Sequence, residues 1–202
     1  METNWYKIEN ENGKKKNKVK YMLCCRNCIP REKRDNKYRI CKKNKEISRD
    51  PNTPPHTKNK FQSWSAHGQD YFVFELLNRK KEGYFIELGG YDGISISNTY
   101  TLEKNYNWKG ICIECEPGLF NLMNKSRNCI CLNEMIDSGE EQKVAFSNGN
   151  GGIVSEDCDN NDKNTITSYH KPKKLEDILD ENNSPKVIDY FSLDVEGAEY
   201  RI

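Results

Sequence analysis

The segment GYFIELGGYDGISISN, residues 83–98, constrains the fold of this chain more than any other. Residues 84–88 form a short apolar run that stops at a glycine, as is typical of a strand buried on both faces of a parallel sheet. The loop after it contains three glycines: Gly89, Gly90 and Gly93. Glycine permits a tight turn there and leaves room for a ligand lying across it, and Ser97 or Asn98 can then cap a helix.

The residues within this loop narrow the choice of ligand. A dinucleotide site requires G-x-G-x-x-G, but Tyr91 stands at the second glycine position and Asp92 puts a carboxylate where a pyrophosphate would lie. A nicotinamide enzyme is therefore disfavoured. The spacing Glu87-x-Gly89-x-x-x-Gly93 instead suits S-adenosylmethionine. Its amino group and sulfonium favour Glu87 and Asp92, and helix amides past Gly93 favour its carboxylate. An ordinary tight turn is the alternative interpretation.

The charge of the chain divides it into two parts. Residues 1–60 contain 18 Lys and Arg against 7 Asp and Glu, a net charge of +11, whereas residues 61–202 carry −10. The first part has hardly any apolar periodicity, so we expect a mostly disordered basic arm followed by one domain. The chain contains no apolar run of the ~20 residues that a transmembrane helix needs and no apolar signal core. Together with cysteines in apolar strand-like runs, this favours a reducing, cytoplasmic location.

The arm contains a cluster of four cysteines: Cys24, Cys25, Cys28 and Cys41. Cys25 and Cys28 have the spacing of half a zinc knuckle, but a fourth ligand would have to come from Cys24, His56 or His67. Unbound thiols are the favoured interpretation, so we predict no metal site. The positive charge is likewise explained by a solvated tail more simply than by nucleic-acid binding.

The pattern after residue 61 predicts alternating helices and strands. Helices are expected near 69–82, at 98–107, after Pro117 and at 175–179. Strands are expected at 84–88, 111–114, 129–132 and 187–195. A hairpin of 143–147 with 153–154 and a polar loop at 157–164 complete the prediction. Glu114 lies 25 positions beyond Gly89, where Rossmann-like sites place the acid that accepts from two ribose hydroxyls. Glu116 is a rival for that role, and Asn133 is expected where an adenine would lie.

Several blocks of residues together resemble the FkbM family of S-adenosylmethionine-dependent methyltransferases. They are Gly68-Gln69-Asp70, FIELGGYDGISISNTYTLEK at 85–104, WKGICIECEP at 108–117 and FSLDVEGAE at 191–199. The resemblance covers about residues 61–202 and implies an α/β, Rossmann-like class I fold that methylates hydroxyls of sugars or other small molecules. It places Glu87, Gly89 and Gly93 around the methionine end of the cofactor and Glu114 at the ribose.

The resemblance also places two acids, Asp194 and Glu196, at the mouth where the methyl group leaves. A carboxylate there can remove the proton of an acceptor hydroxyl, and Asp194 is the first choice for this base. Paired acids holding a divalent metal are a weaker alternative, because no third ligand is in view.

The chain departs from the family pattern after its fourth strand. The expected strand order is 3-2-1-4, which makes the domain incomplete and leaves the fourth strand as an open edge that could pair with a protein partner. A non-catalytic scaffold protein acting through its basic arm is therefore the alternative function.

Overall fold

The protein is described from a computed structural model. It covers residues 61–138, 142–148, 151–156 and 158–202, and in the earlier part of the chain four short segments at 6–9, 16–19, 22–24 and 56–58. The expectation that the remainder of the arm is disordered, and the question of zinc at its cysteines, lie outside the described residues.

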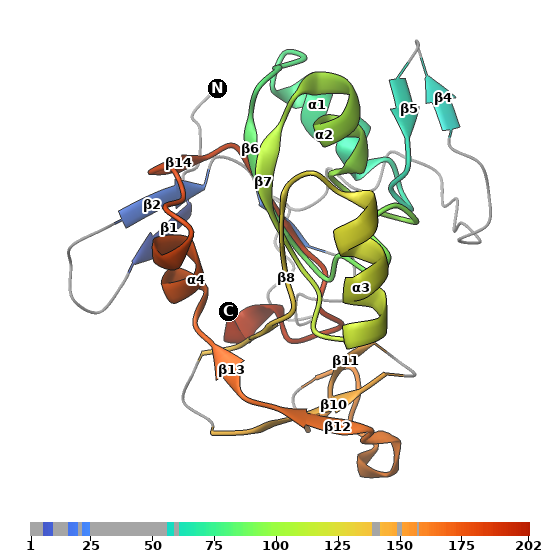
Figure 1. Cartoon of the computed structure of the whole chain (residues 1–202), viewed down its shortest axis with the longest axis vertical. Coiled ribbons are helices and arrows are strands. Elements are labelled where there is room, and N and C mark those ends of the chain that lie inside the picture. The colour runs from blue at the N-terminus through green and yellow to red at the C-terminus, as the bar shows by residue number, and fades with distance from the viewer. Residues whose placement is uncertain are drawn as a thin grey trace, which may run out of the picture.

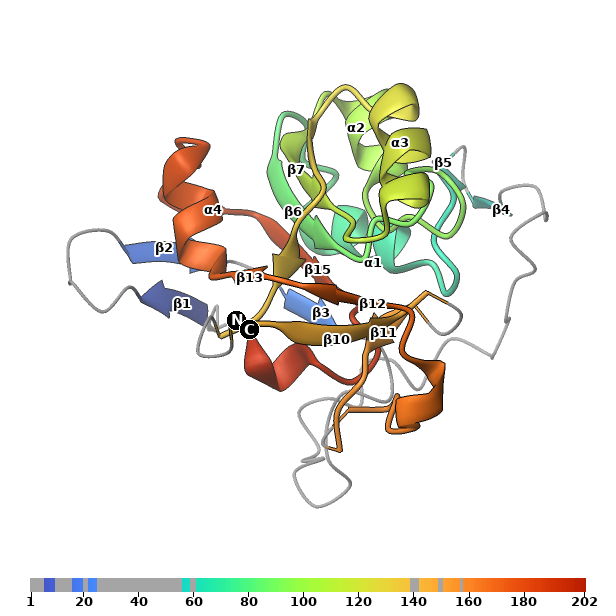
Figure 2. The same cartoon turned by 60° about the horizontal axis from the view of Figure 1, so that its bottom comes forward.

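A five-stranded parallel sheet forms the centre of the domain. Its order is β3-β15-β6-β7-β8. Strands β6, β7 and β8 are labelled in Figure 1, and β3 and β15 in Figure 2. The strands are β3 (Met22–Cys24), β15 (Tyr190–Leu193), β6 (Tyr84–Leu88), β7 (Lys109–Ile113) and β8 (Ile130–Leu132). The predicted order 3-2-1-4 corresponds to β8-β7-β6-β15 and is confirmed.

The predicted open edge at β15 is wrong, because a strand of the basic arm occupies it. Phe191, Ser192 and Leu193 of β15 pair in parallel with residues 22–24 of β3. Two further arm strands, β1 (Tyr6–Glu9) and β2 (Lys16–Val19), form a small sheet with β14 (Val187–Ile188). The edge proposed for a partner protein is therefore filled from within the chain.

Helices cover both faces of the central sheet. The helices are α1 (Gln69–Leu76), α2 (Tyr100–Tyr106), α3 (Pro117–Ser126) and α4 (Leu175–Glu181). Strand β6 shows why the faces differ: Phe85 packs into an aromatic cluster with residues of α1 and α2, while Ile86 and Leu88 pack with α4. Figure 2 shows α4 and the group of α1, α2 and α3 on opposite sides of the sheet.

The other elements lie around this sheet. An antiparallel sheet of order β11-β10-β12, formed by β10 (Val144–Ser147), β11 (Gly152–Ile153) and β12 (Ser168–His170), lies at the lower end of the molecule in Figure 1. The predicted hairpin is confirmed by the pairing of β10 with β11. The remaining elements are β4 (His56–Lys58), β5 (Phe61–Ser63), β9 (Met135–Ile136), β13 (Pro172–Lys173) and two 3-10 turns, Lys163–Thr165 and Glu199–Arg201.

The predicted fourth strand is interrupted by a polar contact. The Asp189 carboxylate, which is buried between β14 and β15, accepts from Lys80 Nζ at 2.7 Å and from the Tyr84 amide at 3.0 Å. These bonds tie the start of β15 to the start of β6.

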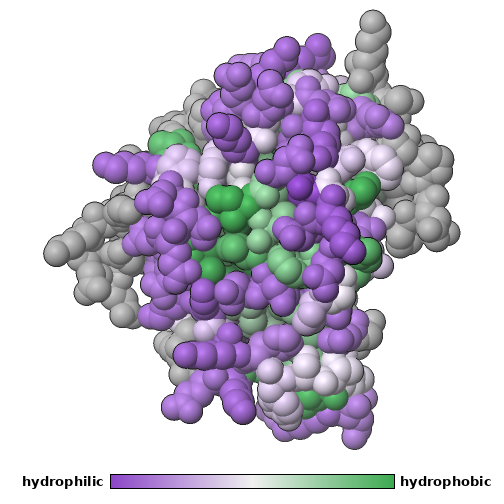
Figure 3. All heavy atoms as spheres, in the orientation of Figure 1, coloured by the Kyte–Doolittle hydropathy of each residue, from purple (hydrophilic) through white to green (hydrophobic). Residues whose placement is uncertain are grey.

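In the face shown in Figure 3, apolar side chains gather in the middle of the molecule and hydrophilic ones surround them.

Candidate active site

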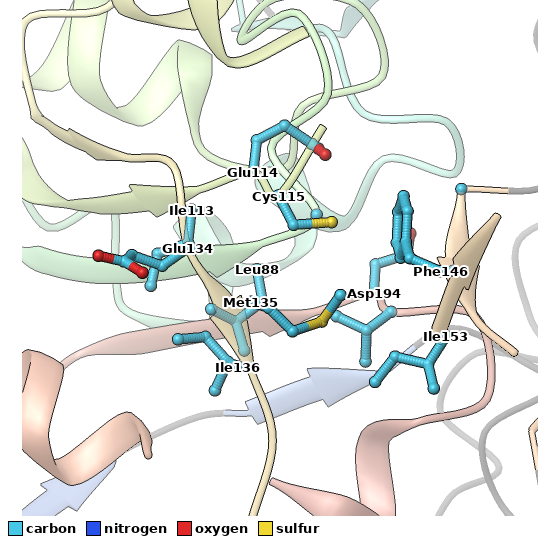
Figure 4. Close-up of a pocket in the computed structure, with 14 residues that line it drawn as sticks. Leu88, Ile113, Glu114, Cys115, Glu134, Met135, Ile136, Phe146, Ile153 and Asp194 are labelled. Carbon is cyan, nitrogen blue, oxygen red and sulfur yellow. The ribbon is translucent and has the colours of Figure 1, made fainter. Parts of the chain in front are cut away.

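A cavity lies at the carboxyl ends of β6, β7 and β15, where open α/β sheets bind ligands. The hairpin β10-β11 and strand β9 form its other walls (Figure 4). It is lined by Leu88, Gly89, Ile113, Glu114, Cys115, Glu134, Met135, Ile136, Phe146, Gly151, Gly152, Ile153, Asp194 and Val195. Three of the predicted site residues, Gly89, Glu114 and Asp194, are therefore brought together.

Glu114 stands at the end of β7 with its carboxylate held by the backbone. Its Oε2 accepts from the Tyr91 amide at 2.8 Å and its Oε1 from the Glu116 amide at 3.0 Å. Burial raises the pKa of Glu114, and these hydrogen bonds act against that rise. Each carboxylate oxygen has a second lone pair, so Glu114 can still accept from a ligand. The rival Glu116 instead caps α3 by accepting from the Leu119 amide and does not line the cavity.

Asp194 lines the cavity at the end of β15, and Glu196 stands outside it. Burial raises the pKa of Asp194, and the Glu87 carboxylate raises it further, whereas His67 lowers it. Glu196 is exposed, with a positive φ of 54°. Partial desolvation of its carboxylate by the surrounding loop, and then the charges of Asp194 and Asp159, raise its pKa. The two acids thus differ in position, and of the two only Asp194 lines the cavity.

The three loop glycines are required by packing within the protein. Gly89 has a φ of +77°, and a side chain on it would overlap the Asp194 carbonyl oxygen. A Cβ on Gly90 would lie 2.6 Å from the sulfur atoms of Cys112 and Met123, and Gly93, with a φ of +85°, lies against Ser126 and Met123 of α3. Of these three loop glycines, only Gly89 lines the cavity. The expectation that these glycines make room for a ligand is therefore compatible with the position of Gly89 alone.

Asp92 stabilises the turn of the loop and does not line the cavity. Its Oδ1 accepts from the amides of Ile94 and Ser95 at 2.8 and 2.7 Å, and its Oδ2 accepts from the Ser95 hydroxyl at 2.7 Å. These contacts use the carboxylate within its own loop, so the predicted interaction with a cationic ligand is not supported by its position.

Glu87 is buried in a polar network between the sheet and the helices. It accepts from the Ser97 hydroxyl at 2.9 Å, the Asn98 amide at 2.7 Å and the Thr99 hydroxyl at 2.6 Å. It also forms an ion pair with Arg127, 3.3 Å from Nη1. Glu87 therefore holds the start of α2 against β6 and does not line the cavity, contrary to its predicted contact with the cofactor.

Arg127 is the residue of this network that the sequence did not reveal. Its side chain is fully buried and also donates to the Gly93 carbonyl at 3.1 Å and to Glu103 at 2.7 Å. An arginine between a helix and a strand has no pattern that distinguishes it from a surface residue. The buried Glu87 carboxylate requires a positively charged partner, and from this requirement a buried arginine or lysine could have been predicted.

Asn133 joins the ends of β7 and β8 and lies beside the cavity without lining it. Its amide donates to the carbonyl oxygens of Glu114 and Cys115 at 2.8 and 3.0 Å. The next residue, Glu134, lines the cavity and pairs with Lys173 at 3.0 Å. The apolar wall from Met135 and Phe146 was not predicted, because these residues come from strands outside the βαβ pattern.

Among the residues that the structure describes, no three or more His, Cys, Asp or Glu side chains are grouped so as to hold a metal ion. None of the helices in the described part of the chain combines the length and apolar character needed to cross a membrane.

Comparison with known proteins identified one family. The model of the methyltransferase FkbM domain matches residues 87–202, which is more than half of the chain. No curated protein and no solved structure was found to match. The matched region contains the cavity, the glycine loop and both acids at the end of β15.

Proposed function

We propose that this chain, which belongs to the FkbM methyltransferase family, transfers a methyl group from S-adenosylmethionine to a hydroxyl of a sugar or other small-molecule acceptor. The observation that carries the proposal is the cavity that Glu114 and Asp194 line together with Gly89. Two carboxylates at the ends of strands in one sheet give the cavity one position for a ribose and one for a reacting hydroxyl.

The residues of the cavity fit this donor. Glu114 is positioned to accept from ribose hydroxyls, and the apolar side chains of Ile113, Met135 and Phe146 suit a flat, weakly polar base. The donor, when bound, supplies a methyl group on a positively charged sulfonium. Asp194 and Glu134 put negative charge in the same cavity, which favours a cationic ligand.

Asp194 is proposed as the base that removes the acceptor proton. Its pKa is raised by burial and by Glu87, so it binds a proton more strongly than an exposed aspartate does. A general base is most effective when its pKa approaches the working pH. Glu196, outside the cavity, is the second choice for this role.

Binding of the donor's product is the direct test. Titration calorimetry with S-adenosylhomocysteine should show micromolar affinity for the chain, and Glu114→Gln should weaken it at least about tenfold, because one charged hydrogen bond is worth roughly 1.5–3 kcal/mol. Glu116→Gln is the matched control: the same change two residues away, at a side chain outside the cavity, should leave the affinity within about twofold. A folded chain that does not bind the product would contradict the proposal.

Transfer to an acceptor tests the role of Asp194. With donor carrying a labelled methyl group and a panel of sugars, Asp194→Asn should lower kcat by about 10²- to 10⁴-fold. A base acts only when deprotonated, so the rate should fall as the pH drops through a pKa above the usual aspartate value. The variant should lose this acidic limb while retaining product affinity. An unchanged pH profile in Asp194→Asn would assign the base elsewhere.

A further inference from the structure

The antiparallel sheet of β10, β11 and β12 extends the wall of the cavity by one strand. Phe146 of β10 pairs with Ile153 of β11, and both residues line the cavity (Figure 4). On its other side Phe146 pairs with Ser168 of β12. Directly paired residues point to the same face of a sheet, and neighbouring strands lie about 4.8 Å apart. Ser168 therefore faces the same way as the two wall residues, one strand spacing beyond Phe146.

A histidine on the same strand holds the Ser168 hydroxyl. Residues two apart in a strand share a face, and His170 Nε2 lies 2.8 Å from Ser168 Oγ, which is a hydrogen-bond distance. The His170 ring also meets the Phe146 ring edge to face, with the ring centroids 5.5 Å apart. Tyr169, between the two, points to the opposite face and is 64% exposed. The pair of Ser168 and His170 is thus fixed beside Phe146, next to the wall of the cavity.

This pair can hydrogen-bond a ligand hydroxyl in either tautomer of the imidazole. Both side chains are half-buried, and within the described part of the chain neither forms another side-chain hydrogen bond. If Ser168 donates to Nε2, then the Nδ1–H of His170 can donate to a ligand and the Ser168 oxygen can accept. If Nε2–H donates instead, the Ser168 hydroxyl is the donor and Nδ1 the acceptor. A ligand hydroxyl uses one donor and one acceptor, and both arrangements supply them.

The distance from the cavity to the pair exceeds the width of one sugar ring. Ile153 and Ser168 are separated by two strand spacings, or about 9.6 Å. The segment after β12 also stays close to the cavity, since Pro172 pairs with Met135 of β9, a cavity residue. A saccharide held in the cavity therefore reaches the pair with a second ring.

We propose that Ser168 and His170 form an acceptor subsite, which binds a hydroxyl of the sugar ring next to the one that is methylated. The acceptor is then a disaccharide or a longer saccharide, and the pair selects it over a free monosaccharide. This inference rests on the proposed function and narrows its acceptor class. The two residues contact a part of the acceptor that does not react, so they determine affinity and specificity, and Asp194 keeps its proposed role as the base.

Binding of the whole chain to an array of printed mono-, di- and trisaccharides tests the proposal without methyl transfer. The strongest binding is expected at saccharides of two or more rings. Ser168→Ala and His170→Phe should each weaken it about tenfold, because each change leaves the partner side chain and the ligand hydroxyl without a hydrogen bond. His170→Phe keeps a ring against Phe146 and removes both nitrogens. Absence of binding to every saccharide, or equal binding to monosaccharides and longer saccharides, would overturn the proposal.

Two further variants distinguish ligand binding from a structural role of the pair. Tyr169→Phe removes a hydroxyl from the opposite face of the same strand and should leave saccharide binding within about twofold. Ser168→Thr keeps the hydroxyl and should retain most of the affinity. If the pair only holds β12 in place, Ser168→Ala should lower the midpoint of urea denaturation and weaken monosaccharide and disaccharide binding equally. That result would overturn the subsite.

Calorimetry with S-adenosylhomocysteine separates this inference from the proposed function. The pair does not line the cavity, so Ser168→Ala and His170→Phe should bind S-adenosylhomocysteine within about twofold of the unaltered chain. A chain that binds S-adenosylhomocysteine but no saccharide would keep its proposed donor and lose the subsite. A chain that binds saccharides through the pair but not S-adenosylhomocysteine would contradict the proposed methyl transfer and support the saccharide site.

Discussion

At the scale of single residues, one buried guanidinium holds the loop network together. Arg127 contacts Glu87 and Glu103, and all three side chains are at most 5% exposed. Burial acts against the charge of Arg127, and the neighbouring thiol and carboxylate groups more than compensate, so its pKa is raised. A buried pair of this kind is weak evidence for added stability, but removal of one partner leaves an uncompensated charge.

Replacement of Arg127 by methionine should therefore lower the free energy of unfolding by about 3–5 kcal/mol. Denaturation in urea, followed by circular dichroism, measures this change. Lys104→Met is the control, because Lys104 also pairs with Glu103, at 3.3 Å, from a side chain that is 26% exposed. The Lys104→Met variant should lose about 1 kcal/mol or less of unfolding free energy. Equal losses in the two variants would contradict the role assigned to burial.

At the scale of elements, the loop between β6 and α2 is fixed by contacts with the strands on either side. The amides of Gly89 and Gly90 both donate to the Ile113 carbonyl at the end of β7, at 3.1 and 3.0 Å. On the other side Gly89 lies directly against the carbonyl of Asp194, the residue that follows β15. The loop is thus clamped between two strand ends that both contribute to the cavity.

Gly89→Ala should separate this steric contact from the effect of backbone conformation. Gly68 has the same φ of +77° but has nothing within 4 Å of an added Cβ. Gly68→Ala should therefore lower the free energy of unfolding only by the cost of a left-handed conformation for alanine, about 1–2 kcal/mol. Gly89→Ala must in addition move the end of β15, so it should cost more in urea denaturation and weaken binding of S-adenosylhomocysteine. Similar losses of unfolding free energy in the two variants would show that the loop can move away from the Asp194 carbonyl without a further loss of stability.

The βαβ unit could be predicted from the sequence because its signals are local. The apolar run at 84–88, the glycines after it and Pro117 each reflect a conformational preference of the residues themselves. The position of Glu114 followed from strand spacing alone. By contrast, the ion pair of Glu87 depends on where Arg127 comes to lie in three dimensions, and no periodicity encodes that. Strand β12 was missed because it has no apolar alternation.

At the scale of the whole molecule, the basic arm completes the sheet of the acidic domain. The arm carries +11 and the domain −10, and strands of the arm pair with both β14 and β15. All four residues of β15 are buried. A buried strand without a neighbour on one side would expose backbone donors and acceptors that readily pair with other chains.

Deletion of residues 1–60 should therefore cause self-association. Removal of β3 leaves Phe191, Ser192 and Leu193 without ladder partners on one side, at a cost of about 1 kcal/mol for each lost hydrogen bond. Size-exclusion chromatography with light scattering should show dimers or larger species, and urea denaturation a lower midpoint.

Deletion of residues 1–15 is the matched control for this experiment. It removes β1, which pairs with β2, and retains the two strands that contact β14 and β15. Because the edge of β15 stays covered, this shorter deletion should keep the association state of the full chain. A monomeric, equally stable protein after removal of all 60 residues would mean that pairing with β3 does not protect the edge of β15.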